Sequence, residues 1–195
     1  MRFRCVLTPV LAIASVGALS AHNQQREPYG KTPDRTITAS PGANNPTKSV
    51  DETDQTFMKK AALRDEAEIQ LGQMAQEKAS SAAVKSFGQR MMKDHSNASD
   101  KLKDIAESQH IALPFALDQQ QKEAADRLSR LPSPQFDQAY MLLMVQEHTK
   151  DVNQFKQEAA NAHNDSVKQF AAATLPVLES HLNEAEQIQQ QLNGK

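Results

Sequence analysis

Apolar side chains recur every three, four or seven residues along four long stretches of this chain, and this spacing limits the fold more than any other feature. In an α-helix it gathers the apolar side chains on one face, which can then pack against a core. Glycine, proline and strand-forming residues are scarce in the same stretches. The sequence therefore predicts an all-α fold and argues against a sandwich, a barrel or a doubly wound sheet. The second stretch illustrates the spacing with Val84, Phe87, Met91, Ala98, Leu102 and Ile105.

We expect the four helices to form a bundle built from two antiparallel hairpins. The breaks near residues 80 and 163 are short, so each adjacent pair of helices must turn back on itself. The break at 111–132 has room for a short extra helix, with Asp118 as its expected N-cap and Gln121 as the capping-box partner. This long connection could cross the length of the bundle, as in a ferritin-like topology, or cap one end, and the sequence leaves both open.

Local signals mark where the long helices begin. Ser49 and Glu52 have the spacing of a capping box at the start of the first helix. Ser133 and Pro134 provide an N-cap and a proline in the first helical position of the third long helix. Pro176 lies inside the fourth, where we expect it to kink the helix.

The first residues have the pattern of an export signal. The basic residues Arg2 and Arg4 precede an apolar run from Cys5 to Leu19, and small residues lie at the end of this run. This order predicts a secretory signal peptide at residues 1–21, because the run is shorter than the roughly 20 apolar residues of a membrane-spanning helix. An uncleaved N-terminal anchor is the alternative. We therefore expect a mature chain that is periplasmic or secreted and, since Cys5 is the only cysteine, free of disulfides.

Residues 22–50 form a predicted disordered linker, because proline and glycine punctuate a polar stretch with few large apolar side chains. The helical domain would then occupy residues 51–193. No later run is apolar enough to cross a membrane, so we expect no transmembrane segment in the mature chain and leave peripheral association with the envelope open. The balance of 22 Lys+Arg against 24 Asp+Glu argues against nucleic-acid binding.

Four ionisable residues interrupt the apolar faces, one on each long helix: Glu68, His95, His148 and His181. Each lies three, four or seven residues from apolar neighbours on its own helix, so each should point inward. At about 1.5 Å of rise per residue, all four lie near the middle of the bundle and within roughly one turn of each other. The sequence therefore predicts a polar layer across the core.

Three imidazoles and one carboxylate are a suitable ligand set for one transition metal ion, with Zn, Fe and Cu as the candidates. Asp94 and Glu147 directly precede His95 and His148, and they are candidate hydrogen-bond partners behind the ligands. Ordinary solvated charges are the alternative for these two carboxylates. For the whole layer, the alternative is a histidine–carboxylate network without metal, because buried polar groups need partners in either case.

Several short motifs lie along the predicted helices. They are Leu71-Gly72-Gln73-Met74-Ala75, Val84-Lys85-Ser86-Phe87, Asp94-His95, Phe136-Asp137-Gln138-Ala139-Tyr140, Glu147-His148 and Thr174 to Leu182, which includes His181. Together they resemble one family of exported bacterial proteins: over residues 53–190 the chain is similar to domain of unknown function family 4142, whose members carry the label "predicted outer membrane protein". The family motifs also fall on Glu68. The resemblance implies a ferritin-like four-helix domain in a bacterial envelope protein, and it implies no established reaction.

The ferritin-like resemblance does not extend to a di-iron centre. That centre needs Glu-x-x-His on two helices, but Met92, Val145 and Leu178 stand three residues before the histidines. The chain also has no nucleophile elbow, phosphate-binding glycine loop or His-Glu-x-x-His motif, so no enzymatic activity is predicted. We expect an exported envelope protein of unestablished activity, either metal-binding or stress-related. The alternative is a structural or interaction module of the envelope without metal.

Overall fold

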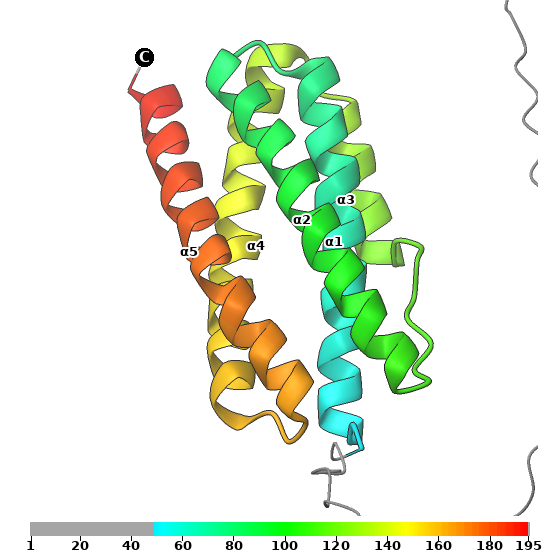
Figure 1. The fold of residues 1–195 in the computed structure, drawn as a ribbon. Helices are drawn as coiled ribbons and strands as arrows, with labels where there is room; N and C mark the ends of the chain where they lie inside the picture. Colours follow the sequence, from blue (N-terminus) through cyan, green and yellow to red (C-terminus); the bar gives the residue numbers. More distant parts are fainter. Residues whose placement is uncertain (1–48, 195) are drawn as a thin grey trace, which may run out of the picture. The chain divides into compact units, whose positions relative to one another are not determined.

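The structure, a computed structural model, describes residues 49–194. Over that range every regular element is a helix, which confirms the predicted all-α fold (Figure 1). The predicted signal peptide, residues 1–21, lies outside the described residues, and so does the predicted linker except for Ser49 and Val50. The helices are α1 (Glu52–Lys78), α2 (Ala82–Ser108), α3 (Gln119–Ser129), α4 (Ser133–Asn161) and α5 (Asp165–Asn193).

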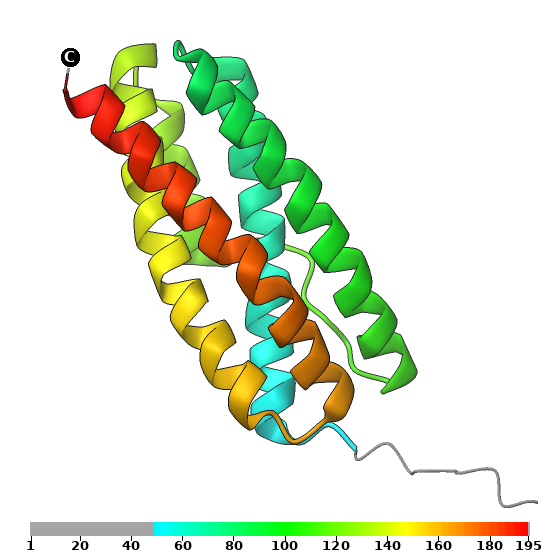
Figure 2. The ribbon, with the colours of Figure 1, turned by 60° about the vertical axis from the view of Figure 1, so that its left-hand side comes forward.

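The four long helices pack side by side as a bundle, and the short α3 lies against α1 and α4. α1 packs mainly against α2 and α4 mainly against α5, while contacts of α2 with α5 and of α1 with α4 complete the bundle (Figure 2). α2 ends and α4 begins at opposite ends of the bundle, so the segment 109–132 runs along its length (Figures 1 and 2). Among the described helices, none has the length and apolarity that a membrane span requires.

The starts of α1 and α3 are set by aspartate caps. Asp118 caps α3 and forms the predicted capping box with Gln121. α1 is capped by Asp51, whose carboxylate accepts a hydrogen bond from the N–H of Asp54 at 2.9 Å. The cap predicted at Ser49 is therefore displaced by two residues, because Asp51 offers an equally good acceptor closer to the first apolar turn.

The start of α4 is also displaced from its predicted position. Ser133 is the first helical residue, and Pro132 occupies the N-cap position, where no side chain caps the helix. Pro134 still falls in the first turn, where the missing N–H leaves no intrahelical hydrogen bond unmade.

The connection between α1 and α2 is held by Asp137 of α4. Its buried carboxylate accepts hydrogen bonds from the backbone N–H groups of Ser80 and Ser81, at 3.1 and 2.8 Å, and from the Ser80 hydroxyl at 2.6 Å. Ser81 is the N-cap residue of α2 and makes no side-chain cap of its own. Asp137 therefore supplies the acceptor that the start of α2 would otherwise lack.

The connection between α4 and α5 is held in the same way by Asp54 of α1. This fully buried carboxylate accepts hydrogen bonds from the backbone N–H groups of His163 and Asn164, at 3.3 and 2.7 Å. Asn164 then caps α5 with its own side chain. Each short connection is thus fixed by an aspartate from outside the two helices that it joins.

Two glycines allow α1 and α2 to approach closely. A Cβ atom on Gly72 would lie 2.6 Å from the carbonyl oxygen of Gly88, and one on Gly88 would lie 2.8 Å from the Cβ of Ala75. Both distances are too short for any side chain, so this helix contact requires glycine at both positions.

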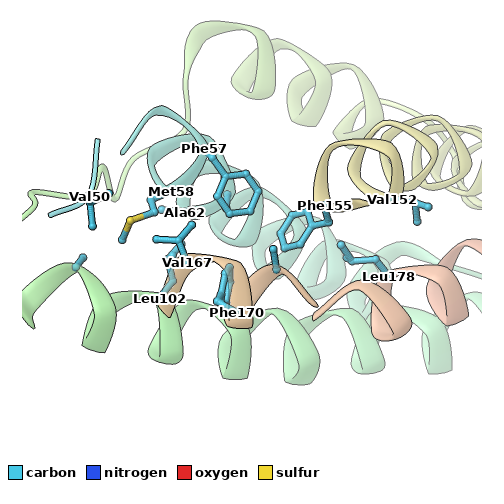
Figure 3. Packing of buried hydrophobic residues seen from close by; sticks show 13 residues of the cluster. Val50, Phe57, Met58, Ala62, Leu102, Val152, Phe155, Val167, Phe170 and Leu178 are labelled. Atoms are coloured by element: carbon cyan, nitrogen blue, oxygen red, sulfur yellow. The ribbon is translucent and has the colours of Figure 1, made fainter. Parts of the chain in front are cut away.

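The apolar core consists of two clusters of buried side chains. In the first, Phe57 packs edge-on against Phe155 and Phe170, with ring centroids 5.0 and 6.4 Å away (Figure 3). In the second, Phe87 packs against Tyr140 at 6.3 Å. The two clusters lie toward opposite ends of the long helices, and the candidate site occupies the space between them.

Candidate metal centre

The polar layer predicted from the sequence separates the two apolar clusters. Along α2, Met91 belongs to the second cluster and Leu102 to the first, and His95 lies between them. His148 and His181 occupy the corresponding positions on α4 and α5. The helical spacing therefore placed all three histidines on the inward face and at the same height, as expected.

The three histidines meet in the interior of the bundle. The ring centroids of His95, His148 and His181 are 5.3, 5.5 and 5.8 Å apart, and one ligating atom from each lies within 4.8 Å of the others. No more than 4% of any of these residues is exposed. The ring of Phe87 packs against His148 and His181, with centroids 6.4 Å away in both cases, so apolar surface borders the group on that side.

One nitrogen of each ring donates a hydrogen bond to a fixed acceptor. His95 Nδ1 donates to Asp65 Oδ1 at 2.8 Å, and His181 Nε2 donates to Asp94 Oδ2 at 2.9 Å. His148 Nδ1 donates to the carbonyl oxygen of Met144, one turn earlier on α4, at 3.0 Å. Because the Met144 carbonyl and the ionised Asp94 carboxylate can only accept, two of these bonds fix which nitrogen of His148 and of His181 carries the proton.

The other nitrogen of each ring has no hydrogen-bond partner. These buried atoms are Nε2 of His95, Nε2 of His148 and Nδ1 of His181. In a neutral imidazole, the nitrogen opposite the N–H carries an in-plane lone pair. Two acceptors without a donor, on His148 and His181, are therefore buried beside the unpartnered Nε2 of His95, an arrangement that a bound cation would stabilise.

Burial and mutual repulsion keep two of the rings neutral. Desolvation, together with the neighbouring His95 and His181, lowers the pKa of His148 to about 3. Desolvation likewise lowers the pKa of His181 to about 4. Burial also lowers the pKa of His95, but the hydrogen bond and charge of Asp65 outweigh it, so the net shift is upward. Neutral imidazole is the form that binds a metal ion.

Glu68 lies next to the histidines but outside the group whose ligating atoms are within 4.8 Å of one another. The residue is 3% exposed, and its Oε2 has no hydrogen-bond partner. Burial raises the pKa of Glu68 from 4.5 to about 8, against the attraction of the nearby His95. Glu68 is therefore mainly protonated at pH 7 when no cation is beside it.

A cavity of about 510 Å³ borders Glu68 from the side of α3. Its walls come from α1, α3 and α4 and from the end of the connection that leads into α3. Leu71 and Leu143 contribute apolar surface, and Lys60 and Arg127 contribute positive charge. Glu68 is thus the one predicted site residue that faces both this cavity and the histidine layer.

Asp94 supports a different histidine from the one suggested by the sequence. It directly precedes His95, yet its carboxylate accepts from His181 on α5. Arg90, one turn earlier on α2, donates to Asp94 at 3.3 Å and to Glu184 on α5 at 2.5 Å. Burial raises the pKa of Asp94, but the bonds to His181 and Arg90 lower it more, so the carboxylate stays ionised.

Glu147 lies on the cavity side of α4 rather than behind a histidine. Its carboxylate pairs with Lys150 at 2.7 Å, and both residues line the cavity that Glu68 borders. Across residues 49–194, no hydrogen bond joins Glu147 to a histidine of the layer.

Asp65 is a member of the site that the sequence reasoning missed. It is buried, it lies on α1 three residues before Glu68, and it holds His95. That spacing places both carboxyl groups on the same face of α1, so the sequence contained a signal. Asp151, three residues after His148, is a further buried carboxylate near the layer that the sequence reasoning missed, and it forms an ion pair with Arg64.

The fold and the site together define an all-helical bundle protein with a buried three-histidine centre. The chain belongs to the family described as Domain of unknown function (DUF4142), whose sequence model matches residues 39–188. This finding confirms the family resemblance, and the match begins inside the predicted linker and includes the three histidines. Comparisons with curated proteins and with solved structures each give no match.

Proposed function

We propose that this protein binds one transition metal ion through His95, His148 and His181. The observation that carries the proposal is the convergence of three buried imidazoles, each with one nitrogen fixed by an acceptor and the other nitrogen without a partner. Carboxylate or carbonyl acceptors behind metal-bound histidines are the usual arrangement, because they orient the ring and increase the basicity of the ligand.

The dimensions suit zinc, iron or copper. Bonds from zinc to imidazole nitrogen are about 2.0–2.1 Å long, so two nitrogens in a tetrahedral site are about 3.4 Å apart. Ligating atoms within 4.8 Å of one another reach that separation with small rotations of the rings. The Glu68 carboxylate is the candidate fourth ligand, since a cation beside it would lower its pKa and stabilise the ionised form.

We also propose a ferritin-like topology of two antiparallel hairpins. Its support is the short connections on either side of the long segment 109–132, together with the packing of α1 on α2 and of α4 on α5. The ligand set differs from the di-iron members of that group, because no Glu-x-x-His motif contributes the histidines. The centre therefore suits one ion, and di-iron chemistry does not follow from the topology.

The proposed place of action is the bacterial cell envelope, after export. The support comes from the sequence of residues 1–21, which has the order of a secretory signal. Fractionation of cells that express the full chain, with mass spectrometry of the mature N-terminus, tests this proposal. A chain found in the cytoplasm with its first residues intact would contradict it.

A metal-free polar network is the second candidate function for the layer. It is favoured by the hydrogen bonds that already hold one nitrogen of each histidine. It leaves several buried atoms unpaired, however, among them one nitrogen on each histidine and Oε2 of Glu68. Because unpaired buried polar atoms are costly, the metal-bound form accounts for more of the site.

Elemental analysis distinguishes the two candidates. The full chain is stripped with a chelator, exposed to Zn²⁺, Fe²⁺ or Cu²⁺ in turn, dialysed and analysed. We expect one ion bound at the histidine layer, lost in His148→Gln and retained in His110→Asn, where the histidine is exposed. Unchanged metal content in His148→Gln, with a loss of thermal stability that does not depend on chelator, would support the metal-free network instead.

A further inference from the structure

A second group of potential metal ligands lies far from the histidine layer. Asp51, Asp54 and His163 each offer one ligating atom, and these atoms lie within 4.8 Å of one another. Asp51 and Asp54 are at the start of α1, and His163 is in the connection between α4 and α5. The group therefore joins two segments that are distant in the sequence.

The distances in this group suit a single cation. His163 Nδ1 lies 2.8 Å from Asp51 Oδ2 and 3.8 Å from Asp54 Oδ1. These values fall on either side of the separation of about 3.4 Å expected between two ligands of a tetrahedral zinc ion. The side chain of His163 is 65% exposed, so an ion can reach the group directly from solvent.

Each carboxylate keeps a lone pair for a cation. Asp51 uses Oδ1 to cap α1, which leaves its Oδ2 facing His163. Asp54 accepts one backbone hydrogen bond on each oxygen, from His163 and Asn164. Since each carboxylate oxygen can accept two hydrogen bonds, the structural role of Asp54 does not prevent it from binding an ion.

Glu158 provides an independent indication of a missing ligand. This residue of α4 is 9% exposed, and its Oε1 has no hydrogen-bond partner. A side-chain hydrogen bond joins Glu158 to Asp54, so its carboxyl group lies beside this group. Within residues 49–194, no lysine or arginine forms an ion pair with Asp51, Asp54 or Glu158, and His163 is the basic side chain that contacts Asp51 and Asp54. A buried carboxyl group that has one oxygen without a partner and lies against two other carboxylates is an arrangement that a divalent ion would stabilise.

We propose that Asp51, Asp54, Glu158 and His163 form a second, independent site for a divalent transition metal ion such as Zn²⁺. The imidazole is the reason for this choice, because Ca²⁺ and Mg²⁺ bind through oxygen ligands, whereas Zn²⁺ accepts both imidazole and carboxylate. The bound ion would tie the start of α1 to the connection between α4 and α5, where Asp54 already forms two hydrogen bonds.

Calorimetric titration of the metal-free full chain with Zn²⁺ tests the proposal. We expect His163→Asn and Glu158→Gln each to lose one equivalent of bound Zn²⁺ relative to the wild type. His110→Asn is the matched control, because His110 is also exposed and its left-handed backbone, with φ of 56°, tolerates asparagine. Circular dichroism checks that each variant remains folded.

The outcomes separate this site from the histidine layer. If His148→Gln loses one equivalent and His163→Asn loses another, both sites bind metal. If only His163→Asn and Glu158→Gln lose metal, the result supports Zn²⁺ binding at the second site and contradicts metal binding at the histidine layer. An unchanged Zn²⁺ count in either His163→Asn or Glu158→Gln would overturn the second site. Displacement of its ion by an equal concentration of Ca²⁺ would overturn the assignment to a transition metal.

Discussion

His181 on α5 donates a hydrogen bond of 2.9 Å to Asp94 on α2, although Asp94 is the sequence neighbour of a different histidine, His95. The side chain of Asp94 is partly exposed, while that of His181 is buried, so the bond runs from the edge of the bundle to its interior. Arg90 strengthens it by holding Asp94 and by bonding to Ser180 on α5 at 2.9 Å. The orientation of one candidate ligand therefore depends on the contact between α2 and α5.

Replacement of Asp94 by alanine should weaken metal binding without removing a ligand. The His181 ring would lose the acceptor that fixes its proton on Nε2, so we expect the affinity for Zn²⁺ to fall by roughly 10- to 100-fold. Competition against a chromophoric chelator measures the change. Asp100→Ala is the matched control, since Asp100 is an exposed aspartate on the same helix. An equal affinity in wild type and Asp94→Ala would show that the bond does not support a ligand.

Glu68 should make the stability of the metal-free protein depend on pH. Burial raises its pKa from 4.5 to about 8 in the folded state, so the folded protein favours the protonated form. Its contribution to the free energy of unfolding is then fully present below about pH 4.5 and is lost as the pH rises to 8 and above. The loss amounts to up to about 5 kcal/mol over that range.

Comparison of the wild type with Glu68→Gln isolates this contribution from those of the histidines. Urea unfolding of both metal-free proteins at pH 5, 6, 7, 8 and 9 should show Glu68→Gln gaining stability relative to the wild type as the pH rises. A difference between the two that stays constant with pH would contradict the raised pKa of Glu68.

Asp137→Ala should destabilise the fold without affecting the histidine layer. The backbone N–H groups of Ser80 and Ser81 would lose their buried acceptor, at a cost of about 2–3 kcal/mol. Urea unfolding followed by circular dichroism measures the loss as a lower midpoint with an unchanged slope. The exposed Asp104 of α2 provides the control, and Asp104→Ala should change stability by less than about 0.5 kcal/mol. Equal midpoints for the two variants would contradict the role of Asp137.

Gly72→Ala should be destabilising even though alanine favours helix more than glycine by about 1 kcal/mol. The new Cβ would lie 2.6 Å from the Gly88 carbonyl oxygen, so α1 and α2 would have to separate, at a net cost of about 1–3 kcal/mol. Ser86→Ala, at an exposed position of α2, adds helix propensity without a steric contact and should be neutral or stabilising. Thermal unfolding of both variants shows whether stability falls or rises. A rise in Tm for Gly72→Ala would contradict the close approach of α1 and α2.

The long helices and the height of the histidine layer could be predicted because both depend on local information. Helical periodicity fixes which face of α2 carries His95, and the distance along the helix fixes its height. The same reasoning applies to His148 and His181, so three residues on separate helices could be brought together without a structure. The capping box of α3 could also be predicted from local sequence, since Asp118 and Gln121 are only three residues apart.

The supporting contacts could not be predicted, because they depend on which helices are neighbours and how they are rotated. Asp94 was expected to serve the layer, but only the packing of α2 on α5 shows that it holds His181. The spacing of Asp65 and Glu68 indicated that both lie on one face of α1, but the pairing of Asp65 with His95 depends on the neighbouring helix. Glu147 points toward the cavity because small rotations of α4 decide which flanking residue faces inward.

The aspartates that hold the two short connections have a consequence for how the protein assembles. Asp137 of α4 completes the link between α1 and α2, and Asp54 of α1 completes the link between α4 and α5. A fragment containing either pair alone would present unsatisfied amides at its own bend, because the acceptor resides in the absent half. Each helix pair therefore depends on the other for a buried hydrogen-bond acceptor. This mutual dependence favours cooperative, two-state folding of the four long helices over a pathway in which one helix pair folds first and the other then docks onto it.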